Sequence, residues 1–270
     1  MNRFKKLFFA FVPLLVCLYL AVCGYFYFIQ ESIIFHPRVL ETDARYDYSF
    51  EFNERWFKPE EGVSIHAIHA FTEADSAKGL VMYLHGNRGA NLTNSDKYTM
   101  FLDIGYDMIY PDYRTYGKSR GDMDNEADLV GDIKHVFGKM AEEYGEENII
   151  LVGYSLGSGV AAQVAADYDP KMLILWTPFY SLVDVKDTAF SFLPDAVLRY
   201  PLRTDLALQE IEEPVHIFYA EDDEVLSVER SIRLTEFLKE EDSFKVIEGQ
   251  RHGWIYRNPE LVKSLEKLLH

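Results

Sequence analysis

The sequence predicts an α/β protein in which a mostly parallel sheet is covered by helices on both faces and is preceded by one N-terminal membrane helix. Three observations predict it: a long uncharged segment at the N-terminus, short apolar runs typical of strands buried on both faces, and helix-length segments between those runs. The 270 residues are 48% hydrophobic and 15% aromatic, enough to fill the core of one folded domain. This composition excludes disorder for most of the chain.

The first element is the N-terminal segment. Residues 7–29 are 23 consecutive uncharged, mostly apolar residues, and a helix of this length spans about 34 Å, enough to cross a hydrocarbon core of about 30 Å. The basic residues Arg3, Lys5 and Lys6 precede it and favour a cytoplasmic N-terminus. We therefore expect residues 1–30 to form a single-pass anchor, with the rest of the chain on the opposite side of the membrane, which is periplasmic or otherwise extracytoplasmic in a bacterium.

A cleaved signal peptide and a lipidated N-terminus are the alternatives for this segment. The apolar run continues through the aromatic residues 25–28 and shows no small-residue cleavage site, whereas an interfacial aromatic belt suits an uncleaved helix. Leu20-Ala21-Val22-Cys23 loosely resembles a lipoprotein-processing signal. Val22 is large for the position before the cysteine, however, and apolar residues follow it. An uncleaved transmembrane helix at about 7–29 is therefore the interpretation we prefer.

The remaining 240 residues differ in charge and in cysteine content. Residues 31–270 carry 24 Lys and Arg against 44 Asp and Glu, a formal charge of −20. Such an acidic domain is a poor partner for phosphate backbones, so we expect no nucleic-acid binding. Both cysteines, Cys17 and Cys23, lie in the N-terminal segment, which excludes a disulfide framework or a cysteine-ligated metal in the domain.

Strands and helices alternate through residues 31–270, which we interpret as one domain because no Gly- and Ser-rich linker interrupts them. Residues 46–71 are expected to form an opening antiparallel pair of strands. The clearest helix is expected at Asp124–Tyr144, where apolar residues recur at helical spacing and Gly145 follows as a stop. The buried strands are predicted at six apolar runs: Gly79–Leu84, Tyr106–Tyr110, Asn148–Val152, Met172–Trp176, Val215–Ala220 and Phe244–Ile247.

The strongest chemical motif is Gly153-Tyr154-Ser155-Leu156-Gly157, which follows one of these strands and precedes a helix of small residues. This is the nucleophile-elbow pattern in the context it requires. A sharp strand-to-helix turn exposes the serine hydroxyl, and the flanking glycines leave room for the turn. The alternative is a tight turn in which Ser155 only caps the helix.

A serine hydroxyl needs a base to take its proton and an acid to orient that base. The chain supplies both after Ser155, in the order Asp or Glu and then His that this motif demands. Four carboxylates, at positions 221–224, follow one strand, and His252 follows the next. Both groups therefore lie at the carboxyl ends of strands, where an open α/β sheet places its site. The spacing alone does not decide between Asp223 and Asp222.

Acyl transfer also needs backbone donors for the developing oxyanion. The N–H of Leu156, directly after the serine, is one predicted donor. The second is expected from the loop after an early strand, where we choose the N–H of Asn87 in the segment His85-Gly86-Asn87. A glycine-rich turn with no catalytic role is the alternative for this loop.

Together these motifs resemble the α/β-hydrolase superfamily, and more narrowly the membrane-anchored serine hydrolases that include protein depalmitoylases and lysophospholipases, with their bacterial relatives. The likeness runs from about residue 30 to the C-terminus. It implies that Asp223, two residues before Val225, is the acid, and it implies no metal and no organic cofactor. The sequence departs from the family at Tyr219-Ala220-Glu221 and at Leu226-Ser227. The motifs that carry the resemblance are His85-Gly86-Asn87, residues 111–121, the elbow, residues 177–182, Asp223-Glu224-Val225 and Gln250-Arg251-His252.

The predicted function is that of a serine hydrolase that cleaves acyl esters or thioesters of lipid or lipidated substrates at the membrane. A short aromatic region, residues 178–213, leaves room for only a minimal cap and could line an acyl groove. The substrate-binding candidates are Tyr180, Phe179 and Trp254, and the alternative is that such aromatic residues face the core. A serine peptidase of the same fold and a noncatalytic membrane-tethered binding protein are the competing hypotheses. The sequence predicts no particular oligomeric state.

Overall fold

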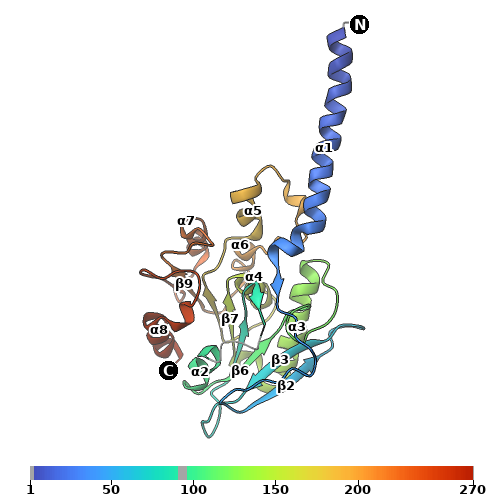
Figure 1. Ribbon diagram of the computed structural model, residues 1–270. Coiled ribbons are helices and arrows are strands. Elements are labelled where there is room, and N and C mark those ends of the chain that lie inside the picture. The colour runs from blue at the N-terminus through green and yellow to red at the C-terminus, as the bar shows by residue number, and fades with distance from the viewer. Residues whose placement is uncertain (1–2, 91–95, 270) are drawn as a thin grey trace.

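The computed structural model describes residues 3–90 and 96–269, with the side chains of residues 11–90 and 97–269. It holds a long N-terminal helix and one α/β domain (Figure 1). The helices are α1 (Arg3–Ile34), α2 (Asp96–Leu102), α3 (Glu126–Tyr144), α4 (Leu156–Ala165), α5 (Leu182–Phe190), α6 (Thr204–Ala207), α7 (Val228–Ser231) and α8 (Pro259–Leu269), with the 3₁₀ turns η1 (Glu146–Asn148), η2 (Asp195–Val197), η3 (Ile232–Phe237) and η4 (Ile255–Arg257). The strands are β1 (His36–Pro37), β2 (Phe52–Phe57), β3 (Ile65–Ala70), β4 (Leu80–Leu84), β5 (Arg88–Gly89), β6 (Asp107–Pro111), β7 (Ile149–Tyr154), β8 (Met172–Trp176), β9 (Val215–Ala220) and β10 (Ser243–Ile247).

The main sheet has eight strands in the order β10-β9-β8-β7-β4-β6-β3-β2. The six strands from β10 to β6 are parallel, and β3 and β2 add antiparallel to the edge. This confirms the predicted mostly parallel sheet with an opening antiparallel pair. All six apolar runs form strands, and five of them are buried on both faces of the sheet. The sixth, β10, lies at the edge of the sheet, where Ser243 and Phe244 are exposed.

Helices cover both faces of the sheet, and strand β4 shows why. Its alternate residues Leu80, Met82 and Leu84 pack with α3 and α4 in one core cluster. Val81 and Tyr83 point the other way and pack with α2 and α8 in a second cluster. Since side chains alternate along a strand, one five-residue segment contributes to two cores. Because the six strands from β10 to β6 run parallel, their carboxyl ends lie at one edge of the sheet, between the two helical layers.

Helix α3 follows its sequence prediction closely. Asn125 is the N-cap, its side chain accepts the Asp128 N–H, and the Asp128 carboxylate accepts the backbone N–H of Asn125, which completes a capping box. The helix ends at Gly145, whose positive φ of 82° favours glycine. The predicted start at Asp124 is two residues early, because Asn125 supplies the cap.

Helix α1 projects from the domain (Figure 1). Its C-terminal half contacts the domain, and these contacts reach back to Tyr19. Helix α1 contains a 24-residue stretch, Phe11–Ile34, that is long and apolar enough to cross a membrane, and an apolar 18-residue part of this stretch is not buried inside the domain. The helix continues past the predicted end at residue 29. The Gln30 side chain donates to the Val197 carbonyl at 3.0 Å and accepts the Arg199 N–H at 2.7 Å, so this polar residue is buried against the cap instead of ending the helix.

Candidate active site

Ser155 occupies the turn between β7 and α4. Its backbone has φ +51° and ψ −117°, a conformation that non-glycine residues rarely adopt. The Ser155 N–H donates to the Trp176 carbonyl at 3.0 Å, and the serine carbonyl accepts the Ser158 N–H at 2.9 Å. The turn is therefore held from both sides, as strained positions at functional sites are.

Two glycines make this turn possible, as the motif predicts. A Cβ on Gly157 would lie 2.1 Å from the Leu84 carbonyl oxygen, and one on Gly153 would lie 2.6 Å from the Gly157 oxygen. Both distances are far below van der Waals contact, so α4 can approach β4 and β7 only when both residues lack a side chain.

His252 lies between Ser155 and Asp223. Its Nε2 is 2.9 Å from Ser155 Oγ, and its Nδ1 is 2.6 Å from Asp223 Oδ2. A carboxylate only accepts hydrogen bonds, so Nδ1 carries the proton and Nε2 is left to accept the proton of the serine hydroxyl. All three side chains are shielded from solvent. The three groups form one hydrogen-bonded chain across the carboxyl ends of β7, β9 and β10.

The four consecutive carboxylates after β9 have different partners. Asp223 is the one that bonds the ring of His252, and its second oxygen accepts the N–H groups of Val225 at 2.9 Å and Leu226 at 2.7 Å. Glu221 accepts the Gly249 N–H at 2.9 Å. Asp222 is exposed. The turn that closes on Asp223 therefore aims its carboxylate at the histidine.

The loop that carries His252 is fixed on several sides. The His252 N–H donates to Glu224 Oε2 at 3.1 Å, and its carbonyl accepts the Tyr154 hydroxyl at 3.1 Å. Hydrogen bonds from its own N–H and from the N–H of His252 lower the pKa of Glu224. Burial raises the pKa of Tyr154, which stays protonated and remains a donor. Tyr154, which precedes the serine, thus positions the loop that carries His252.

The loop after β4 has each of three consecutive carbonyls held by a side chain. The Tyr113 hydroxyl donates to the His85 carbonyl at 2.8 Å, the Tyr116 hydroxyl donates to the Asn87 carbonyl at 2.7 Å, and His85 Nδ1 donates to the Gly86 carbonyl at 2.6 Å. The C=O and N–H of a trans peptide point in opposite directions. Holding the Gly86 carbonyl therefore also sets the direction of the Asn87 N–H. Sequence reasoning named the histidine and both tyrosines only as motif residues and missed this role.

Asn87 also joins this loop to the end of α1. Its side-chain amide donates to the Ile34 carbonyl at 2.9 Å, and its carbonyl accepts the His36 N–H at 2.8 Å. Strands β1 and β5 then pair in parallel. The end of the long helix and the loop after β4 are consequently one hydrogen-bonded unit.

The three predicted substrate-binding residues lie in three different environments. Phe179 is 2% exposed, and its ring packs where a Cβ on Gly159 would be, 2.6 Å away. Phe179 is therefore a core residue, as expected if the aromatic residues of this region face the core instead of lining a groove. Tyr180 is half-buried beneath the Arg233 guanidinium, 4.0 Å from the ring centre. Trp254 is 57% exposed and stacks with Arg257. Because Phe179 is buried in the core, the three side chains do not form one exposed surface.

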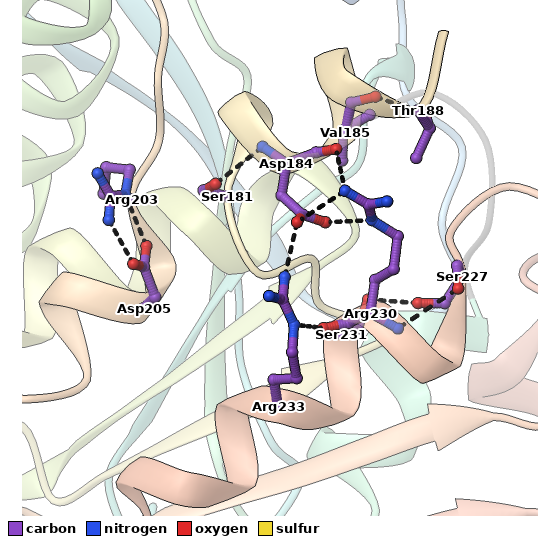
Figure 2. A network of polar contacts seen from close by, with 10 residues as sticks. All are labelled: Ser181, Asp184, Val185, Thr188, Arg203, Asp205, Ser227, Arg230, Ser231 and Arg233. Atoms are coloured by element: carbon purple, nitrogen blue, oxygen red, sulfur yellow. Dashed lines mark hydrogen bonds and ion pairs between the residues drawn. The ribbon is translucent and has the colours of Figure 1, made fainter. Parts of the chain in front are cut away.

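The cap of residues 178–213 is short, as predicted, and an ionic cluster ties it to the element that follows the Asp223 turn. Figure 2 shows Arg230 and Arg233 pointing at Asp184 of α5 from α7 and η3. Arg230 Nε lies 2.8 Å and Arg233 Nη2 lies 2.6 Å from the Asp184 carboxylate. Partial burial opposes ionisation, but hydrogen bonds and charge from both guanidinium groups leave the pKa of Asp184 below its ordinary value. This ionic cluster therefore fixes the position of the cap relative to the turn that carries Asp223.

Lys97 is a buried cation beside the site that sequence reasoning missed. Its Nζ lies 5.0 Å from the ring centre of Tyr256, 5.3 Å from that of Tyr83 and 5.8 Å from that of Tyr154. Burial lowers the pKa of Lys97 to about 8. The position of a lysine in a helix gives no sign of such a cage, because the rings come from distant strands and turns. Among the side chains that the structure describes, no group of three or more His, Cys, Asp and Glu is placed to hold a metal ion.

We expect stability to fall as the pH drops from about 6.5 to about 4. Burial lowers the pKa of His85 and of His69 to about 4, against an ordinary value of 6.5. The unfolded chain then binds more protons than the folded one in this window, so acid favours unfolding, by about 3 kcal/mol per histidine over the full window. Urea unfolding in detergent at pH 7 and pH 4.5 should show a smaller loss for His69→Gln than for wild type. Equal losses would contradict the prediction.

Comparisons with known proteins agree with this fold. The family model described as serine aminopeptidase, S33, matches residues 75–199. Lysophosphatidylserine lipase ABHD12 of Macaca fascicularis is 28% identical over 225 residues, covering 72% of this chain and 56% of that protein, so the chain spans little more than half of that relative. The Gallus gallus protein of the same name is 27% identical over 265 residues, covering 79% of this chain and 68% of that protein.

Among solved structures, the Pyrococcus furiosus esterase Pf2001 superposes with a TM-score of 0.70 at 18% identity, covering 87% of this chain and 97% of that one. Est1E of Butyrivibrio proteoclasticus, solved with ferulic acid, gives a TM-score of 0.65 at 16% identity and covers 80% of this chain and 97% of that one. Likeness at this level of identity shows the fold. With the sequence relatives, it leads to one conclusion: the chain is a serine hydrolase with the α/β-hydrolase fold, and it is similar to the abhydrolase group.

Proposed function

We propose that the protein is a membrane-anchored serine hydrolase that cleaves acyl esters or thioesters of lipid or lipidated substrates through an acyl-enzyme intermediate. One observation carries the proposal: Ser155, His252 and Asp223 form a continuous hydrogen-bonded chain with links of 2.9 Å and 2.6 Å. These distances lie within the reach that a nucleophile, a base and its orienting acid require.

In the proposed mechanism, Ser155 Oγ attacks the acyl carbonyl while His252 Nε2 takes its proton. The imidazolium that forms is stabilised by the Asp223 carboxylate and then gives the proton to the departing alkoxide or thiolate. Water attacks the acyl-enzyme in the second half, with His252 again as the base, and Ser155 is regenerated. Two backbone N–H groups and the histidine all donate to Asp223, and these hydrogen bonds hold its carboxylate in place beside His252.

The oxyanion is assigned to the backbone N–H groups of Leu156 and Asn87. Leu156 begins α4, so its N–H lies at the positive end of a helix next to the nucleophile. The carbonyl and the side-chain amide of Asn87 are already engaged with His36, Tyr116 and Ile34, which leaves its backbone N–H as the group of this residue for the oxyanion. Donors fixed in advance need no reorganisation during the reaction, which is where their effect on rate comes from.

A lipid-like ester is the substrate class that the molecule supports best. Residues 1–30 are proposed as the anchor and residues 31–270 as the catalytic domain, with the basic residues 3, 5 and 6 on the cytoplasmic side. A tethered enzyme meets lipid substrates at high effective concentration. The sequence relatives named as a lipase also favour an ester over a peptide bond. The name of the matching family model keeps a peptidase as the second candidate.

The test is labelling with a fluorophosphonate probe, followed by turnover of graded substrates in detergent. We expect wild type to label and Ser155→Ala to stay unlabelled. Acyl esters, thioesters, lysophospholipids and aminoacyl amides of matched acyl length then separate the candidates. Faster turnover of amides than of long-chain esters would favour the peptidase, and a folded wild type that does not label would overturn the proposal.

His85 is expected to act on kcat through the peptide that it holds. His85→Phe keeps a ring but loses the Nδ1–H donor to the Gly86 carbonyl, so the Asn87 N–H is no longer fixed. Removing an oxyanion donor costs about 10²–10³ in kcat, and we expect about 10- to 100-fold for this indirect loss, with little change in KM. His85→Asn, whose amide nitrogen stands at the same number of bonds from Cα, should recover much of the rate.

His66→Gln is the matched control for this prediction. His66 is also fully buried, and its Nδ1 lies 3.8 Å from Asp112, the same distance that separates His85 Nε2 from that carboxylate. It holds Glu54 and not the loop after β4. This variant should lose stability and keep kcat. Steady-state kinetics on the three variants decides, and equal kcat values in His85→Phe and wild type would contradict the role.

A further inference from the structure

The cap follows α1 far along the apolar part of that helix. The Tyr19 hydroxyl donates to the Phe192 carbonyl at 2.9 Å, and the Phe26 ring lies 4.9 Å from that of Phe190. Tyr19 is 15 residues before the end of α1, which corresponds to about 22 Å along the helix axis. The loop after α5, which carries Phe192, therefore lies beside the middle of the predicted span. This loop thus extends along α1 beyond the rest of the domain, toward the N-terminus of the helix.

The position of the membrane follows from helix length. Lys6 is the last basic residue before the apolar run, and about 20 helical residues cross a hydrocarbon core of about 30 Å, so the core ends near Phe26. Tyr19 then lies about 10 Å inside the outer boundary, and so does the loop that it contacts. Phe192 is 52% exposed, and an exposed apolar side chain is more stable in the hydrocarbon of a bilayer than in water.

An apolar cavity of about 200 Å³ lies between this part of α1 and the cap helix α5. Phe26 and Ile33 of α1 face Val185 and Ala189 of α5 across it. Ile33 is 41% exposed, so the cavity borders the surface of the molecule. Ser155 and His252 are not among its walls. This cavity is therefore a site apart from the triad, at the level where the domain meets the lipid.

Three polar residues line this cavity, and all three have their polar ends engaged elsewhere. The Thr188 hydroxyl donates to the Val185 carbonyl at 2.6 Å. The Gln30 amide bonds with the backbone of Tyr27, Val197 and Arg199. The Lys186 ammonium donates to the Leu193 carbonyl and pairs with Asp187 and Asp195. The cavity thus offers hydrocarbon contacts and no polar group for a headgroup. The same lysine also neutralises the two carboxylates nearest the tip of the cap.

We propose that the tip of the cap, residues 190–192, is inserted in the outer leaflet and that the cavity holds one acyl chain of a lipid in that leaflet. The inference rests on the membrane anchor of the proposed function and not on its chemistry. Burying exposed aromatic area in lipid gains free energy in proportion to that area. An occupied cavity would then hold the cap against α1, next to the segment that bonds the Asn87 loop.

The depth of the cap is tested with an environment-sensitive fluorophore. In a Cys17→Ser, Cys23→Ser background, a single cysteine replaces Phe192 and carries the label, in vesicles of phosphatidylcholine with spin-labelled acyl chains as quenchers. Phe244→Cys on β10 is the matched control, because this phenylalanine is 51% exposed and lies at the far edge of the sheet. We expect quenching about fivefold stronger at position 192. Equal quenching at both positions would overturn the insertion.

The cavity is tested with a phosphatidylcholine that carries a photoreactive diazirine in its acyl chain. Wild type should form adducts within residues 182–198, and Ala189→Trp, a change at an exposed position on the rim, should reduce them about fivefold. Phe244→Trp should leave the yield unchanged. Ser155→Ala should also leave it unchanged, so a failed hydrolase assignment and a failed lipid site give different results. Undiminished adducts in Ala189→Trp would exclude the cavity as the acyl site.

Discussion

Replacing Ser155 by alanine is expected to lower kcat for an acyl ester by about 10⁴- to 10⁶-fold, and replacing His252 by alanine to lower it by a similar factor. Alanine at position 155 leaves no nucleophile, and alanine at position 252 leaves a hydroxyl that cannot lose its proton at neutral pH. Because the two groups act as one unit, the double variant should be little worse than either single variant. Additive losses would show that the two residues act independently.

His216→Gln is the control for that experiment. His216 also follows Ser155 in the chain and is largely buried, but it lies within β9 and bonds Ser243 at 2.8 Å. Its variant should keep wild-type kcat. If wild type, Ser155→Ala and His252→Ala all showed the same turnover, the fold would be serving a membrane-tethered binding protein, and the hydrolase assignment would fail.

The strand pattern of the sheet could be predicted because its physics is local to each strand. A strand buried on both faces must be apolar at nearly every position, so Met172–Trp176 and Val215–Ala220 have the bounds expected from sequence. The length of α1 could not be predicted in the same way. Gln30 and Glu31 read as the polar end of a span, but Gln30 is 5% exposed and Glu31 pairs with Arg199 at 2.8 Å. Partners about 170 residues away decide where this helix ends.

The candidate site likewise has a part that could be predicted from the sequence and a part that could not. The order of serine, acid and histidine along the chain selects Ser155 and His252, because topology brings the ends of β7 and β10 to one edge. Aromatic composition alone could not place a substrate surface. Phe179 carries the same side chain whether it lines a groove or fills the gap above Gly159, and the close approach of α4 gives it the second role.

The choice among four consecutive carboxylates leads to the second large effect. Asp223→Asn is expected to lower kcat about 10⁴-fold near neutral pH, while Asp222→Asn leaves it within about twofold. An asparagine at 223 can still occupy the turn, but its amide NH₂ can face the ring and leave His252 with its proton on Nε2, the nitrogen that must accept from Ser155. At position 222 the side chain is exposed and its backbone N–H, which donates to the Gln250 carbonyl, is unchanged by the substitution.

The pH dependence of the rate also separates the two variants, because a purely structural role of the carboxylate would not change it. Raising the pH should partly restore Asp223→Asn, because hydroxide assists removal of the serine proton when the histidine is in the wrong tautomer. Asp222→Asn should keep the wild-type pH profile. Both changes remove one negative charge from adjacent positions, so a general effect of charge would move both variants equally. A loss in Asp222→Asn as large as that in Asp223→Asn would therefore remove the orienting role from the single carboxylate that touches His252 Nδ1 at 2.6 Å.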